Sequence, residues 1–154
     1  MMKRTFIYSF VLFSLIFASC TENKNIQSTD ESEIKAAALN YFEGWYSRDT
    51  VRLDLALHPE LAKRRKKVDE QGNEYIYSTT KEILLGKLIE KAREEGKKEI
   101  DNNNLMIQIK IFDIHNDVAS ALIESKDYYD YIHLIKYNNE WKIINVLWER
   151  KPKV

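Results

Sequence analysis

The residue whose type and position best suit proton chemistry is Asp130. It shares one face of a predicted strand with Ile132 and Leu134, because side chains two apart on a strand point the same way. A carboxylate among apolar neighbours could accept a proton or anchor a ligand, or it could be a structural acid held by a tyrosine hydroxyl or by Arg64. His133 lies three residues further on, so we expect it on the opposite face, at a surface or an interface. Asp130 and His133 therefore do not predict a simple acid–base pair.

His58 is the second candidate for proton transfer. It precedes Pro59 at a predicted junction between two helices. A neutral imidazole can accept or donate a proton near pH 7. The alternative is a histidine that caps the loop backbone, and the sequence favours this structural role without excluding the chemical one.

Three aromatic residues are candidates for a ligand-binding wall. Tyr41 and Trp45 belong to the apolar stripe of the first predicted helix, and Trp148 belongs to the last predicted strand. Aromatic walls with a few polar groups are typical of small-molecule pockets, and flat rings stack well on a flat ligand. The alternative is plain core packing, which the stripe favours for Tyr41 and Trp45.

The densest charge run is Lys63–Lys67, with the sequence KRRKK. Since Pro59 suits the first turn of a helix, we expect a helix over residues 59–66 and interpret the run as its solvated end. Contact with anionic lipid headgroups or with an anionic ligand is the alternative. Asp69 and Glu70 follow at once and weaken the positive field.

Apolar spacings of three and four residues predict the helices that position these side chains. The first helix is expected to begin with a capping box formed by Asp30 and Glu33 and to end near Ser47. Residues 51–57 predict a second short helix, and a further helix is expected from the cap at Thr79 to Gly96. A brief strand over residues 75–77 is expected between them.

From residue 105 the apolar period changes to two, which indicates strands. The expected strands cover residues 105–112, 118–125, 128–137 and 140–149. Asn138 and Asn139 fit a tight hairpin turn, because asparagine tolerates positive φ. Helices followed by an antiparallel meander predict an α+β fold.

The N-terminus resembles the signal of an exported protein. Lys3 and Arg4 precede the uncharged run 6–18, which ends in small residues before Cys20. This run is shorter than the roughly 20 residues of a bilayer-spanning helix. The ending resembles the lipobox of bacterial lipoproteins, in which the cysteine becomes the lipidated first residue. A transmembrane anchor and cleavage before an unlipidated cysteine are the less favoured alternatives.

These features predict three regions and an exported location. We expect residues 1–19 to form the signal peptide, residues 20–30 a flexible tether, and residues 31–154 the folded domain. Lipidated Cys20 would attach the protein to a membrane of the bacterial cell envelope. Cys20 is also the only cysteine of the chain, so the domain cannot rely on disulfides.

Composition excludes several function classes. The chain has 24 basic and 24 acidic residues, and this balance does not suggest a nucleic-acid-binding protein. The three histidines are scattered, and the sequence contains no HExxH motif, no glycine-rich phosphate loop and no GxSxG elbow. We therefore expect no metal site and no cofactor.

Several motifs resemble the putative lumazine-binding proteins of the nuclear-transport-factor-2-like superfamily. They are residues 38–46 (ALNYFEGWY), 56–61 (ALHPEL) with Arg64 close behind, 114–120 (IHNDVAS), Asp130-Tyr131 with Leu134, and 141–148 (WKIINVLW). The resemblance implies a cone in which helices pack in the concave face of a strongly curved antiparallel sheet and leave a pocket at the open end. It also implies that Arg64 points into that pocket. It carries over no secure catalytic set.

We expect a membrane-tethered module that binds a small aromatic or lipidic ligand through Tyr41, Trp45, His58, Arg64, Asp130 and Trp148. One alternative is a partner interface, such as a homodimer through the sheet. The other is an isomerase- or dehydratase-like enzyme with Asp130 or His58 as proton acceptor. Convergence of Asp130, His58 and a tyrosine hydroxyl in a closed pocket would favour the enzyme. Neutralisation of Asp130 by Arg64 and a cavity filled by tryptophan would favour the interface.

Overall fold

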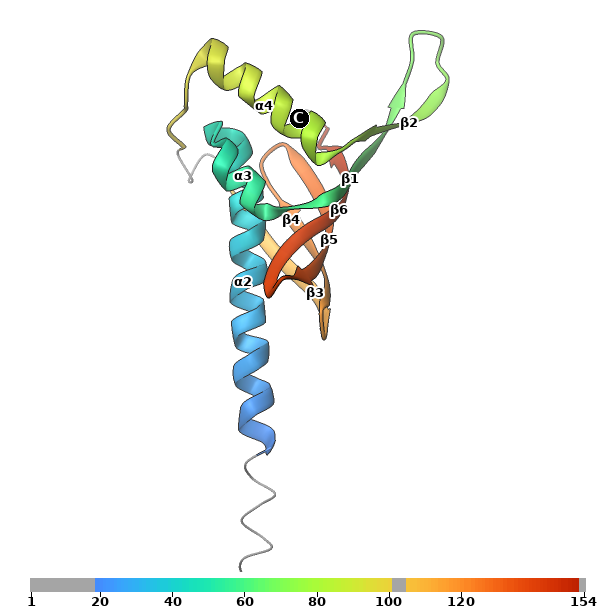
Figure 1. Cartoon of the computed structure of the whole chain (residues 1–154). Coiled ribbons are helices and arrows are strands. Elements are labelled where there is room, and N and C mark those ends of the chain that lie inside the picture. Colours follow the sequence, from blue (N-terminus) through green and yellow to red (C-terminus); the bar gives the residue numbers. More distant parts are fainter. Residues whose placement is uncertain (1–18, 101–104, 153–154) are drawn as a thin grey trace, which may run out of the picture.

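The computed structural model describes residues 19–100 and 105–152 of the chain. The predicted signal segment up to residue 18 lies outside the described residues. The elements in order are α2 (Ser19–Ser47), α3 (Thr50–Ala56), β1 (Leu57–Val68), β2 (Glu74–Thr79), α4 (Lys81–Glu95), β3 (Gln108–His115), β4 (Val118–Glu124), β5 (Tyr128–Tyr137) and β6 (Glu140–Arg150). Figure 1 shows the long helix α2 beside the curved sheet, with α3 and α4 near its C-terminal end. The α+β class predicted from the sequence is confirmed.

The first helix begins earlier than the sequence predicted. The capping pattern placed its start at Asp30, but α2 is helical from Ser19, so the expected tether 20–30 continues the helix. Asp30 does not cap the helix. Its carboxylate Oδ1 accepts hydrogen bonds from Lys136 Nζ at 2.7 Å and from Trp141 Nε1 at 2.9 Å. The side chain that looked like a cap therefore ties α2 to the β5–β6 hairpin.

The turn between α2 and α3 depends on a glycine. A Cβ atom built on Gly44 would lie 2.7 Å from the backbone nitrogen of Leu53. Only a residue without a side chain lets α3 approach α2 so closely. Asp49 caps α3, because its side chain accepts hydrogen bonds from the amides of Val51 and Arg52. This close packing brings the end of α3 to the start of β1.

Residues 57–68 form a strand, and the helix expected over residues 59–66 is wrong. β1 pairs with β2 in antiparallel and with β6 in parallel orientation, so hydrogen bonds on both sides outweigh the helical preference of lysine and arginine. Burial alternates along the strand, with residues 63, 65 and 67 half-buried and residues 64, 66 and 68 exposed. The basic run is therefore divided between the two faces of the sheet.

The later strands follow the prediction, except that β3 covers residues 108–115 instead of the expected 105–112. β3 to β6 form an antiparallel meander, and the sheet order is β2-β1-β6-β5-β4-β3. Asn138 and Asn139 have φ values of 52° and 62°, as the predicted hairpin turn requires. The pairing of β1 with β6 is the sheet's parallel contact. The helix before β3 is capped by Thr80 rather than Thr79, which ends β2 instead.

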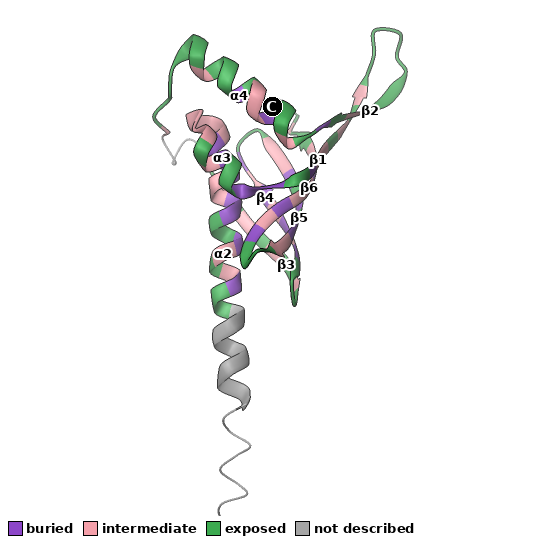
Figure 2. Ribbon diagram, viewed as in Figure 1, coloured by how far each residue is buried: buried purple, intermediate pink, exposed green. Residues whose placement is uncertain are grey.

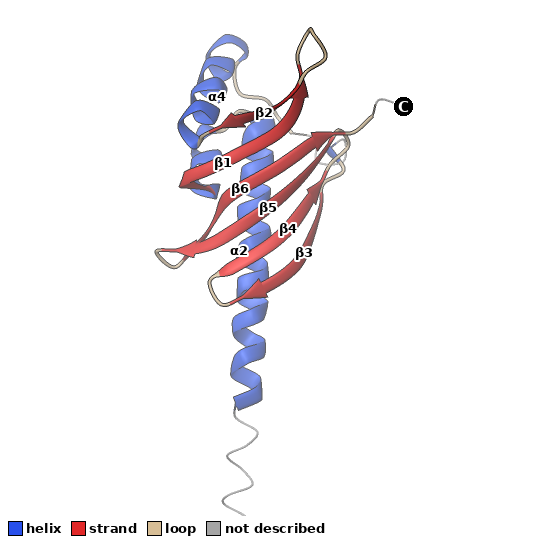
Figure 3. Ribbon diagram, turned by 90° about the vertical axis from the view of Figure 1, so that its right-hand side faces the viewer, coloured by secondary structure: helices blue, strands red, loops and turns tan. Residues whose placement is uncertain are grey.

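One face of the sheet carries the helices. Figure 3 shows α2 crossing behind the strands, with the opposite sheet face uncovered. Buried residues line the sides of α2 and of the strands that face each other (Figure 2). The fully buried side chains from both layers include Ile34, Leu53, Leu57, Ile132, Leu134, Ile143 and Val146. α4 contacts α3 and β1, so it lies beside the end of the core that is formed by α3 and the start of the sheet.

Candidate functional site

A cavity of about 300 Å³ lies between the C-terminal half of α2, the sheet and α4. This volume is at the lower end of the range typical of small-molecule sites. Its lining combines aromatic rings with charges. The aromatic members are Tyr41, Phe42, Trp45, Tyr46, Tyr77, Tyr128 and Trp148, and the charged members are Lys63, Arg65, Lys67, Lys87 and Asp130. The cavity is therefore a mostly aromatic space with a basic lining.

Asp130 forms the most buried polar cluster of this cavity. Only 3% of Asp130 is exposed, and its Oδ1 accepts hydrogen bonds from Tyr41 Oη at 2.9 Å and from Lys63 Nζ at 2.8 Å. Lys63 also donates a hydrogen bond to the Tyr41 hydroxyl. The prediction of an inward-facing acid held by a tyrosine is confirmed, but its cationic partner is Lys63 and not Arg64.

Burial governs the ionisation of the two groups around Asp130. Loss of hydration lowers the pKa of Lys63, and the Asp130 carboxylate opposes this effect. Burial raises the pKa of Tyr41 well above its ordinary value, and the negative charge of Asp130 raises it further. Tyr41 therefore stays a neutral hydrogen-bond donor, and Lys63 compensates the charge of Asp130.

The remaining cations come from the strand that the sequence analysis took for a helix. Because side chains alternate along β1, Arg65 and Lys67 point to the same side as Lys63. The Arg65 guanidinium lies 4.5 Å from the centre of the Trp148 ring, and Lys67 Nζ lies 4.3 Å from that of Tyr77. Lys87 of α4 donates a hydrogen bond of 2.5 Å to the Tyr77 hydroxyl, and this bond is the main cause that lowers the pKa of Tyr77.

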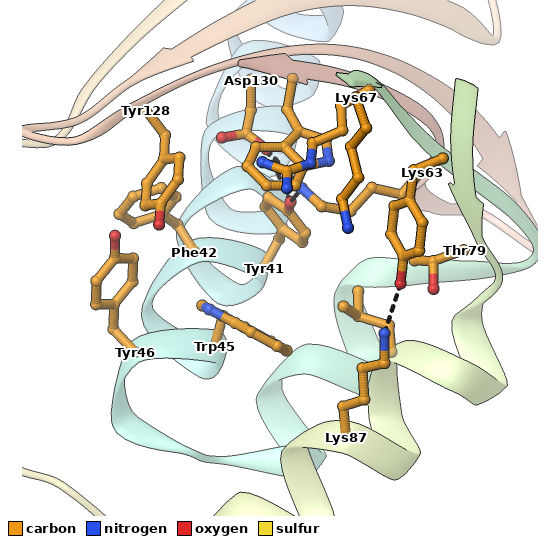
Figure 4. A pocket seen from close by; sticks show the side chains of 14 residues that line it. Tyr41, Phe42, Trp45, Tyr46, Lys63, Lys67, Thr79, Lys87, Tyr128 and Asp130 are labelled. Atoms are coloured by element: carbon orange, nitrogen blue, oxygen red, sulfur yellow. Dashed lines mark hydrogen bonds and ion pairs between the residues drawn. The ribbon is translucent and has the colours of Figure 1, made fainter. Parts of the chain in front are cut away.

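The structure brings four of the predicted site residues together. Tyr41, Trp45, Asp130 and Trp148 all line the cavity. Figure 4 shows Trp45 and Tyr41 projecting from α2 toward the space below Asp130. These aromatic residues are also partly or fully buried against the core, so the packing role and the cavity role coincide.

The two other predicted residues lie outside the cavity lining. His58 Nδ1 accepts a hydrogen bond from the Glu60 amide at 3.0 Å, and its ring contacts that of Tyr137 edge-on at 4.6 Å. This geometry matches the capping role considered for His58. Arg64 lies on the other face of the sheet and donates to Asn145 Oδ1 at 3.1 Å. His133 is exposed beside Asn145, as expected from its strand position.

For Lys63, Arg65 and Lys67 the sequence favoured a solvated helix end, with contact to an anionic lipid headgroup or ligand as the alternative, so it did not predict that these three residues line the cavity. Every residue of the run KRRKK is basic, so the sequence contains no alternation of apolar and polar residues that would predict a strand. The burial of every second cation could therefore not be predicted. Tyr46 ends the motif 38–46 but was not chosen as a site residue, and Tyr128 and Lys87 lie outside the motifs.

The described part of the chain contains neither a metal-binding group nor a membrane-spanning helix. No group of three or more histidine, cysteine, aspartate or glutamate side chains there is arranged to hold a metal ion. None of the helices within the described ranges has the length and apolarity that crossing a bilayer requires.

Comparison with known families agrees with this architecture. The sequence model of the family described as "putative lumazine-binding" matches residues 29–149. The chain belongs to the putative lumazine-binding family. The matched range begins within α2 and extends almost to the end of β6. It includes all residues that line the cavity.

Solved structures show the fold of this putative lumazine-binding domain. A nuclear-transport-factor-2-like protein of unknown function from Shewanella baltica is 18% identical, with a TM-score of 0.59 over 82% of this chain and 97% of that one. A similar protein from Silicibacter pomeroyi gives 11% identity and a TM-score of 0.61, over 81% and 98% of the two chains. A protein with a cystatin-like fold from Nostoc punctiforme gives 12% identity and 0.52, over 82% and 80%. No curated protein matches the chain. The predicted nuclear-transport-factor-2-like fold is confirmed.

Proposed function

We propose that this protein binds a small, flat organic molecule in the cavity beside Asp130 while it is attached to a membrane of the bacterial cell envelope through lipidated Cys20. The observation that carries the binding function is the open cavity of about 300 Å³ with aromatic walls. A cavity of this kind is the usual site for a small ligand. The family description names lumazine, a flat heteroaromatic compound, which agrees with these walls.

The arrangement of the rings supports stacking on a ligand. Phe42 and Tyr46 pack against each other with ring centres 4.8 Å apart, and Tyr128 meets Trp148 edge-on at 5.5 Å. These contacts fix the walls of the cavity. Trp45 packs against the core but is not fully buried, and within the described residues it takes part in no ring pair or cation–ring contact, so we expect the rest of its indole to face a ligand. A flat molecule resting on Trp45 would gain apolar burial and stacking together.

The length of α2 suits a tethered protein. Cys20 and Tyr41 lie on the same helix, so about 30 Å along the helix axis separates the lipidation residue from the cavity. Figure 1 shows the N-terminal part of α2 extending away from the sheet. A protein anchored at Cys20 would hold its cavity clear of the lipid surface.

The catalytic alternative has less support. Asp130 accepts two hydrogen bonds and faces a lysine, and His58 is outside the cavity lining. Of the three groups whose convergence would favour an enzyme, only Asp130 and the Tyr41 hydroxyl lie together in the cavity. Oδ1 of Asp130 is thus already engaged by two donors of the protein itself.

A second candidate function is self-association through the uncovered sheet face. Phe112, Tyr131 and Leu147 are about half exposed there, and the rings of Phe112 and Tyr131 stack with their centres 6.2 Å apart. An exposed apolar group on an uncovered sheet face favours a second copy of this chain as partner. Sedimentation of the purified domain tests it: a dimer that becomes a monomer in Tyr131→Glu supports the proposal, and a monomeric wild type contradicts it.

Native mass spectrometry of the protein purified from its own cells tests the binding function. We expect a small non-covalent adduct on the wild type and a much weaker one on Trp45→Ala, which removes the free ring from the wall. Tyr129→Ala is the matched control, because Tyr129 is on β5 one residue from Asp130, its ring is outside the cavity lining, and it is not part of the proposed self-association group. No adduct on the wild type, together with no thermal shift by any compound of a broad library, would overturn the binding function.

Metabolic labelling with palmitate tests the anchor. We expect label and membrane fractionation for the wild type and loss of both for Cys20→Ser. An unlabelled wild type in the soluble fraction would contradict the anchor and leave the binding function standing.

A further inference from the structure

The walls of the cavity differ in character from one side to the other. Figure 4 shows Phe42, Tyr46 and Tyr128 together on one side, and Lys67, Lys87 and Thr79 on the other. The first group comes mainly from α2, and the second from β1, α4 and β2. A ligand that fits both sides must carry an apolar body and a polar end.

The charges of the cavity do not balance. Lys63 is paired with Asp130, which is the cavity's carboxylate. The described residues provide no ion-pair partner for Arg65, Lys67 or Lys87. These three residues, the cation group, therefore leave an excess of positive charge on one wall. The positive charge of Arg65 also contributes to lowering the pKa of Lys63, which agrees with such an excess.

Pairing between β1 and β2 holds the cation group in place. Arg65 is the direct cross-strand partner of Tyr77, and the Tyr77 ring faces Lys67 while its hydroxyl accepts from Lys87. Contacts with ring faces position Arg65 and Lys67 without using their hydrogen-bond donors, whereas Lys87 uses one donor on the Tyr77 hydroxyl. Arg65 Nε is buried and has no hydrogen-bond partner. A buried donor left unpaired is costly, so this group calls for an acceptor that the protein does not supply.

From these observations we infer that the ligand is an organic oxyanion, with an aromatic carboxylate as the simplest member of the class. This inference rests on the proposed binding function and specifies its substrate class. The acidic group lies between Arg65, Lys67 and Lys87, and the flat body lies against Trp45 and its aromatic neighbours. Charge-assisted hydrogen bonds from lysine and arginine to a carboxylate are stronger than bonds between neutral groups. The cation group therefore selects acids over neutral molecules of the same shape.

Calorimetric titration with naphthalene-2-carboxylate and its neutral carboxamide tests this inference on the purified domain. We expect the acid to bind at least tenfold more tightly than the amide, and the difference to shrink as salt concentration rises. Lys67→Gln and Lys87→Gln should each reduce the preference for the acid about threefold or more. Both residues are at least partly exposed, so these variants should fold.

Lys66→Gln is the matched control, because Lys66 belongs to the same strand but points away from the cavity and pairs with Glu74. It should bind both probes like the wild type. Equal binding of acid and amide, or an equal loss in Lys66→Gln and Lys67→Gln, would overturn the inference while leaving the binding function standing. A neutral molecule identified as the copurifying adduct would do the same. Absence of any probe binding and of any adduct would overturn both.

Discussion

Two clusters of similar composition occupy different places in this molecule. In the hairpin cluster, Asp30 accepts hydrogen bonds from Lys136 at 2.7 Å and from the Trp141 indole at 2.9 Å. In the cavity cluster, Asp130 accepts hydrogen bonds from Lys63 at 2.8 Å and from the Tyr41 hydroxyl at 2.9 Å. Each cluster thus joins one carboxylate oxygen, one lysine and one aromatic donor across distant parts of the chain.

The two clusters respond to their surroundings in opposite ways. The hydrogen bond from Lys136 lowers the pKa of Asp30 and, in return, the hydrogen bond to Asp30 raises the pKa of Lys136. In the cavity cluster, burial lowers the pKa of Lys63 despite the carboxylate beside it. The exposed side-chain fraction is 27% for Lys136 and 12% for Lys63. Access to water therefore decides whether the lysine gains or loses stability as a cation.

This difference separates a structural role from a functional one. The hairpin cluster connects α2 to the β5–β6 hairpin, and its lysine remains partly exposed to water. The cavity cluster keeps a carboxylate and an ammonium out of water at the wall of a binding site. A buried pair adds little net stability relative to apolar residues of similar size, so a role in the site is the better reason for its presence.

The largest expected effect comes from breaking the cavity cluster. Asp130→Asn leaves the Lys63 ammonium buried without a counter-charge, and we expect the free energy of unfolding to fall by about 3–5 kcal/mol. Replacing both members, in Lys63→Met with Asp130→Leu, should recover most of this loss. Urea unfolding at pH 7 measures both effects.

Asp113→Asn is the control for this substitution, because Asp113 is exposed on β3. It should change stability by less than about 0.5 kcal/mol. A loss under about 1 kcal/mol for Asp130→Asn would show that Lys63 stays hydrated, and the contrast between the two clusters would disappear.

Breaking the hairpin cluster should cost less. Asp30→Asn removes the charge but keeps an acceptor for the Trp141 indole, and Lys136 can turn to water. We expect a loss of about 1.5–3 kcal/mol in urea unfolding, the range for hydrogen bonds to charged groups. A loss as large as that of Asp130→Asn would mean that the two clusters are buried alike.

The sequence predicted the framework of both clusters but only part of their membership. Strand periodicity from residue 105 onward placed Asp130 on the inner face, and helical periodicity placed Tyr41 on the inner stripe of α2. Both signals depend on the local chain, where apolar residues mark the buried side. The short α3 was correct for the same reason, and the turn at Asn138 and Asn139 was correct because asparagine tolerates positive φ.

The partners of these residues could not be predicted, because long-range pairing decides them. Lys63 faces Asp130 only because residues 57–68 insert as a strand beside β6, which local preference does not indicate. Asp30 and Glu33 have the spacing of a capping box, yet the helix extends past them and Asp30 turns to the hairpin. His58 and Arg64 were chosen from their motif neighbours, but the register of β1 directs both away from the cavity.

The smallest effect, a difference in pH dependence, gives the sharpest comparison of the clusters. The pKa of Asp30 is lowered from 3.8, so its contribution to stability is present above that pH and is lost as the pH falls through the lower folded value. Asp30→Asn should therefore flatten the acid side of the stability curve. An unchanged acid limb would contradict the role of Asp30 as an ionised acceptor.

On the alkaline side the two lysines should act in opposite directions. The pKa of Lys63 is lowered from 10.5, so below pH 10.5 the unfolded chain holds this proton more tightly and stability rises with pH. The pKa of Lys136 is raised from 10.5, so its contribution is complete below that pH and is lost as the pH rises through the folded value. Urea unfolding from pH 8 to 11 measures both effects. Compared with the wild type, the free energy of unfolding of Lys63→Met should rise less with pH, and that of Lys136→Met should fall less. Changes of the same sign in both variants would mean that water reaches the two ammonium groups equally, and burial would no longer explain why the clusters differ.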